Sequence, residues 1–136
     1  LRRLPDLEEL SFSNEQADDR VLEQLRGLRK LERLNLWNSR IGDAGLKHLK
    51  ELPSLTSLEL VAHTGATPLT DDCLADLAAL KKLKYLRLGT SAMTAEGLGK
   101  LFPIFCKTSR CKPRHVFDEC GCWVSFSNNS IAVGNK

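Results

Sequence analysis

Four cysteines and a histidine gather near the end of the chain, where they could hold a metal ion or form disulfides. They run Cys106-x4-Cys111, then His115, then Cys120-Gly-Cys122, all within 17 residues. Zinc prefers such sulfur and nitrogen ligands in tetrahedral sites. Common structural zinc sites use C-x2-4-C pairs, whereas the second pair here is separated by a single residue. We therefore expect no metal here and no cofactor, with zinc on the four cysteines as the alternative.

The segment 105–136 differs in composition from the rest of the chain. It holds five positive and two negative residues, while residues 1–104 hold fifteen of each, so all of the net charge of +3 lies in this segment. The run Ser127-Asn-Asn-Ser130 favours a poorly ordered basic tail. A disulfide-linked C-terminal cap and a frameshifted read-through are the other interpretations. We expect residues 107–136 to make few contacts with the rest of the chain.

The basic residues of this tail raise the question of a nucleic-acid partner. Lys107, Arg110, Lys112 and Arg114 fall within eight residues, but no aromatic residue is interleaved with them. Such a run is typical of a solvated tail, and no nucleic-acid partner is expected. No apolar stretch approaches the ~18 residues that a membrane span needs, so no membrane span is expected.

Catalytic chemistry has few candidates elsewhere in the chain. The three histidines lie in different contexts, at His48, His63 and His115. Asp71-Asp72 is a paired carboxylate that helix capping explains. Cys73 occupies a place in the sequence pattern where Val21, Gly45 and Gly97 also stand, which indicates a compact filler. No nucleophile-elbow, zinc-protease or phosphate-loop motif is present, so we expect no enzyme, and a Cys/His-dependent enzyme ranks last.

The elements that would position these residues come from a repeated pattern. The motif L-x-x-L-x-L/F occurs four times, with steps of 24, 24 and 28 residues, and the longer step contains the turn-forming stretch 63–68. Its occurrences are Leu7–Phe12, Leu31–Leu36, Leu55–Leu60 and Leu83–Leu88. Leu1 and Leu4 match the end of a further repeat, which predicts a longer array.

The periodicity changes within each repeat. The L-x-L end of the motif has period two and predicts a short strand, whereas leucines at positions 16, 19 and 22 predict one side of a helix. Capping of the helix starts is expected from Asp19, Asp43, Asp71 and Thr94. A stacked leucine core follows, in which Leu34, Leu46, Leu58 and Leu74 should be almost fully buried. The predicted fold class is therefore α/β.

Residues 1–104 resemble the leucine-rich-repeat family. The segments Ile41–Leu46, Leu69–Leu74 and Met93–Leu98 look like the I-T/G-D-x-G-L stretch of its 24-residue class, found in bacterial repeat proteins and in substrate-recognition subunits of ubiquitin ligases. The resemblance implies an α/β solenoid of about four repeats plus part of a fifth, with parallel strands on the concave face and helices on the convex face. Position 9, usually Asn, Cys or Thr, departs from the family pattern, so the side-chain ladder there is expected to be weak.

In such a solenoid, residues between the strand leucines project from the concave sheet face. The predicted binding residues are Arg33, Asn35, Trp37, Glu59, Tyr85 and Arg87, which include the residue types enriched at binding hot spots. The expected function is a protein-interaction module that binds a protein or peptide there, without catalysis. The substrate-recognition part of a ubiquitin ligase or another targeting complex is the alternative.

Overall fold

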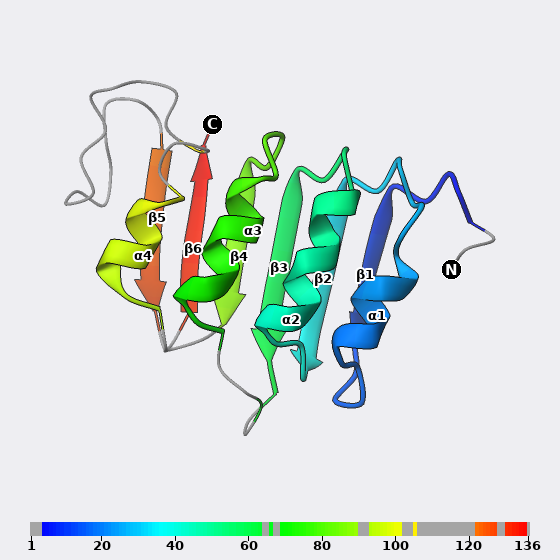
Figure 1. Cartoon of the computed structure of the whole chain (residues 1–136), viewed down its shortest axis with the longest axis horizontal. Coiled ribbons are helices and arrows are strands. Elements are labelled where there is room, and N and C mark those ends of the chain that lie inside the picture. The colour runs from blue at the N-terminus through cyan, green and yellow to red at the C-terminus, as the bar shows by residue number, and fades with distance from the viewer. Residues whose placement is uncertain are drawn as a thin grey trace.

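The protein is an α/β fold built on one sheet, seen in a computed structural model that describes residues 4–63, 66, 69–89, 93–101, 105, 122–127 and 130–135. Within these residues, six strands lie in the order β1-β2-β3-β4-β6-β5 (Figure 1). The strands are β1 (Glu9–Ser13), β2 (Arg33–Ser39), β3 (Ser57–Ala62), β4 (Tyr85–Gly89), β5 (Cys122–Ser127) and β6 (Ser130–Asn135).

The first four strands are parallel and lie side by side in chain order. Their pairing is in register, so that Leu10, Leu34, Leu58 and Leu86 are partners across successive strands. Because side chains alternate between the two faces of a strand, this register puts the second and third leucines of each motif on one face. The residues between them lie on the other face.

Short helices cover one face of this sheet (Figure 1). They are α1 (Asp19–Gln24), α2 (Asp43–Leu46), α3 (Leu74–Ala78) and α4 (Ala95–Gly99), and 3-10 turns extend two of them at η1 (Lys47–Glu51) and η2 (Asp71–Cys73). The predicted alternation of strands and helices is confirmed over residues 9–99. No helix among the described residues is long and apolar enough to cross a membrane.

The leucines from strands and helices meet between the two layers. Leu34, Leu46, Leu58 and Leu74 are each 0% exposed, which confirms the predicted core. At the β1 end the core thins, since Leu10 and Phe12 are half-buried. Among the described residues, no further strand packs on the outer side of β1.

The C-terminal segment contacts the repeats more extensively than expected. Strand β6 pairs with β4 in antiparallel fashion from Tyr85–Gly134 to Gly89–Ser130, and β5 pairs with β6. Val133 is 5% exposed and belongs to the leucine core. The expectation that residues 107–136 make few contacts with the repeats is therefore wrong for β6, because it extends the sheet at β4 and packs Val133 into the leucine core. A domain boundary at residue 105 stays a prediction.

Aspartates at the helix starts join neighbouring segments instead of capping their own helices. The Asp19 carboxylate accepts the N–H of Gly42 at 2.8 Å, and Asp71 accepts the N–H of Thr94 at 2.9 Å. The caps are the preceding residues: the Asp18 carboxylate accepts the N–H of Arg20, and the Thr70 hydroxyl accepts that of Asp72. The expected capping role is thus wrong for Asp19, Asp43 and Asp71.

Thr94 does act as the predicted cap, since its hydroxyl accepts the N–H of Gly97 at 3.0 Å.

Contacts between neighbouring repeats occur at position 9, where the side-chain ladder is expected to be weak. The His63 backbone N–H donates to the Ser39 carbonyl at 2.7 Å, and the His63 ring lies 2.7 Å from the Asn38 amide oxygen. Asn38 has a positive φ of 53°, a conformation that asparagine tolerates better than most residues.

Candidate functional site

The sheet face without helices carries a regular grid of polar and aromatic side chains. We call it the open face. It consists of Glu9, Ser11, Ser13, Arg33, Asn35, Trp37, Ser57, Glu59, Val61, Tyr85, Arg87 and Gly89. In-register pairing aligns these residues in three rows across β1 to β4. Neighbouring strands lie about 4.8 Å apart, so side chains from several strands reach one another.

Two aromatic side chains of this face lie close to the carboxylate of a third residue, Glu59. The Trp37 indole Nε1–H donates to Glu59 Oε2 at 3.3 Å, and Glu59 is close enough to the Tyr85 hydroxyl to raise the pKa of Tyr85. The three residues lie on β2, β3 and β4, and each aromatic residue is a diagonal neighbour of Glu59 in the register. Diagonal neighbours lie within reach of aromatic side chains. The carboxylate is thereby held between two rings.

The surroundings of Tyr85 shift its proton equilibrium. The pKa of Tyr85 is raised, first because partial burial disfavours the phenolate, and then because the negative charge of Glu59 and the hydrogen bond to it favour the phenol. The positive charge of Arg87 lowers the same pKa. The hydroxyl therefore stays protonated at neutral pH and remains a donor to Glu59.

Arg33 is engaged by a neighbour on the same face. Its Nε and Nη2 donate to Glu9 Oε2 at 2.9 and 2.7 Å. The pKa of Arg33 is raised by this hydrogen bond and by the charge of Glu9. Both side chains are about half exposed, so water screens the pair. Arg33 and Glu9 thus neutralise each other across β1 and β2.

All six predicted binding residues lie on the open face, but they do not form one cluster. The structure brings Trp37, Glu59 and Tyr85 together, while Arg33 turns to Glu9. Asn35 and Arg87 are the register partners of Glu59 on either side. Glu9 is not among the predicted binding residues, although its 24-residue offset from Arg33, one repeat, is the sequence signal that places the two side by side.

Trp37 is the most prominent apolar group of this face. Its side chain is 43% exposed, and among the described residues only Leu4 is another large hydrophobic residue with comparable exposure. Leu4 lies before β1, whereas Trp37 lies within the sheet. An aromatic side chain that is anchored at its N–H and open at its ring suits a contact with another molecule.

The Cys73 thiol has none of the surroundings that activate a nucleophile. It is 0% exposed, and its Sγ donates to the Thr70 carbonyl at 3.1 Å. Burial raises the pKa of Cys73 to about 12, and the negative charge of Asp43 and a hydrogen bond to it add to the rise. A protonated thiol is a poor nucleophile and metal ligand. Cys73 packs as a small core residue.

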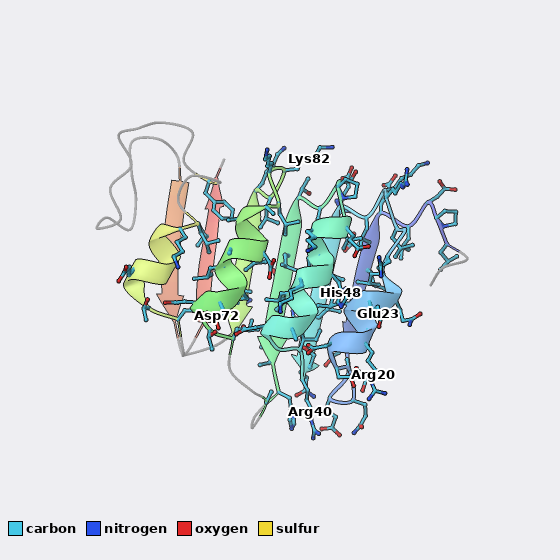
Figure 2. The ribbon with its side chains drawn as sticks, viewed as in Figure 1. Arg20, Glu23, Arg40, His48, Asp72 and Lys82 are labelled. Atoms are coloured by element: carbon cyan, nitrogen blue, oxygen red, sulfur yellow. The ribbon has the colours of Figure 1, made fainter. Side chains whose placement is uncertain are left out.

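The candidate acids and bases are dispersed over the helix side. Figure 2 shows His48 and Asp72 on separate elements, with His48 on η1 and Asp72 on η2, just before α3. The Asp71 carboxylate is occupied by the N–H and hydroxyl of Thr94. Adjacent carboxylates at Asp71 and Asp72 therefore have different surroundings and do not act as a pair.

Metal binding finds no support in the part of the chain that the structure describes, where no three His, Cys, Asp or Glu residues are placed to hold an ion. Cys106, Cys111, Cys120 and His115 lie outside the described residues. Cys122 begins β5, and its backbone pairs with Asn135. The predictions of no metal at these cysteines, and of zinc as the alternative, both stay predictions.

No protein-family model matches the chain, and no curated protein matches it either.

Proposed function

We propose that this chain is part of a leucine-rich-repeat solenoid that binds a protein or peptide on the open face and performs no chemistry of its own. The repeated motif and its 24-residue step support the family assignment. The in-register parallel strands and the leucine core between sheet and helices agree with it. The buried, protonated thiol of Cys73 does not act as a nucleophile.

The observation that carries the binding proposal is the exposed Trp37 ring beside Glu59 and Tyr85. Tryptophan and tyrosine at the centre of a polar surface are typical of binding hot spots. The open face also combines both signs of charge with aromatic groups, which suits a polypeptide ligand better than a polyanion.

A displayed library of random twelve-residue peptides, selected on the full chain, tests this function. Selected peptides should lose about 2 kcal/mol or more of binding free energy with Trp37→Ala, as expected for a hot spot. Lys47→Ala changes an exposed residue of η1 on the helix side and serves as the control that leaves binding unchanged. Peptides that depend on Lys47 and not on Trp37 would contradict the proposal, as would a selection that yields no binder.

A further inference from the structure

We infer that Glu59, between Trp37 and Tyr85, is the subsite for a basic side chain of the bound peptide, a lysine ammonium or an arginine guanidinium. This inference rests on the proposed function and names the ligand chemistry of its central cluster. It follows from how the charges on the open face are paired.

The two carboxylates of the open face differ in their partners. Glu9 forms an ion pair with Arg33 at 2.7 Å, so its charge is compensated. Glu59 accepts a hydrogen bond from the neutral Trp37 indole N–H, and Tyr85, whose pKa Glu59 raises, is uncharged as well. It forms no ion pair in the part of the chain that the structure describes. Its negative charge is therefore available to a cation from outside.

The Glu59 carboxylate has room for a further donor. A carboxylate offers about four lone-pair positions, and the Trp37 N–H occupies one of them. Trp37 and Tyr85 also hold the carboxylate in one orientation before a ligand arrives, which reduces the entropy lost on binding. The charge and the geometry are thus in place without the ligand.

The rings add a second attraction for a cation. An ammonium or guanidinium group near the face of Trp or Tyr is attracted by the negative face of the ring. The Trp37 ring is 43% exposed and is tied to Glu59 through its N–H. A long basic side chain can therefore lay its methylene stem on the ring while its head reaches the carboxylate.

Arg87 places a positive charge beside Glu59, and this charge allows a test of the sign of the ligand's charge. It is the register partner of Glu59 on β4, is exposed, and forms no ion pair within the described residues. Its positive charge repels a basic ligand and attracts an acidic one. Removing the two charges must therefore change the affinity for a basic peptide in opposite directions.

The experiment uses the peptides selected on the full chain and compares two charge-removing variants of the open face. Glu59→Gln should weaken the binding of the selected peptides on the order of tenfold or more, because a charged hydrogen bond is lost. Arg87→Gln should strengthen it. Glu23→Gln and Arg20→Gln make the same charge changes on the helix side, where Figure 2 shows both residues, and should leave binding unchanged. Circular dichroism and a thermal melt verify that each variant is folded.

The outcomes separate this inference from the proposed function. Two results together support the basic subsite. Trp37-dependent peptides are enriched in lysine or arginine, and they lose binding when this basic residue of the peptide is changed to alanine. Trp37-dependent peptides that carry no enriched basic residue, or that bind Glu59→Gln unchanged, overturn it and leave the binding function standing. Acidic peptides that are weakened by Arg87→Gln overturn it in favour of an anionic ligand. A selection without Trp37-dependent peptides overturns both.

Discussion

The Asp43 carboxylate accepts both the backbone N–H and the hydroxyl of Thr70, at 3.0 and 2.5 Å, although the two residues are 27 positions apart in the sequence. Asp19 and Asp71 make the corresponding contact with Gly42 and Thr94. Each carboxylate thus satisfies an N–H at the start of the next helical segment, a group that has no partner within its own helix. We call this series of contacts along the helix side, made by Asp19, Asp43 and Asp71, the aspartate ladder.

Asp43→Ala should therefore lower the free energy of unfolding by about 1–2 kcal/mol, because the Thr70 N–H and hydroxyl lose their acceptor. Urea denaturation followed by circular dichroism measures the change. Asp72→Ala is the matched control, since its side chain is exposed and near the same helix start. A loss as large for Asp72 as for Asp43 would mean that the general charge at helix starts matters and the aspartate ladder does not.

The aspartate ladder also explains why glycine stands opposite an aspartate. A Cβ at Gly45 would lie 3.1 Å from the Asp19 Cα and would overlap the Asp19 carboxylate. Gly45→Ala should destabilise the fold by about 1–3 kcal/mol, as overpacking does. Gly99→Ala places its Cβ in open space within α4 and should be neutral or stabilising. Equal stability of the two variants would show that Asp19 can move aside.

The sequence predicts the strand leucines, their burial and the helical segments, because the periods of two and three are local and recur along the chain. The C-terminal hairpin is not among the predictions, although apolar residues stand at every second position on both sides of an Asn-Asn pair, at Val124 and Phe126 before it and at Ile131 and Val133 after it. The change in charge and cysteine content drew the interpretation toward a tail. The prediction of a tail gives the composition of this segment more weight than its strand-like periodicity.

The arrangement on the open face was predictable only in part. The register places Arg33 beside Glu9 and Glu59 beside Arg87, and it follows from the 24- and 28-residue steps. Which neighbour a side chain contacts depends on its rotamer, which the sequence does not state. Arg33 turns to its direct register partner, whereas Trp37 reaches diagonally to Glu59.

The contact between Asp71 and Thr94 makes stability depend on acid. The Thr94 hydroxyl and then its N–H donate to the carboxylate and lower the pKa of Asp71 below 3.8. Because the folded-state pKa lies below the unfolded one, the stabilisation is present above about pH 4 and is lost as the pH falls through the folded-state pKa. The stability difference between the parent and Asp71→Asn should shrink between neutral and strongly acidic pH.

Urea midpoints of the two proteins across this pH range test the dependence. Thr94→Val, which removes the hydroxyl donor with little change in shape, should reproduce part of the effect. A difference between the parent and Asp71→Asn that stays constant with pH would contradict an ionised Asp71 as the acceptor.

The Cys73 thiol should resist alkylation in the folded protein. Burial, the charge of Asp43 and a hydrogen bond to it raise its pKa to about 12, so the reactive thiolate is scarce near pH 8. Iodoacetamide treatment followed by peptide mapping should find Cys73 unmodified in the native chain and modified in urea. Any native labelling should keep rising with pH without levelling off below the pKa. Rapid native labelling near pH 8 would mean an accessible thiolate, and it would restore a nucleophilic role for Cys73 that its buried position between Thr70 and Asp43 argues against.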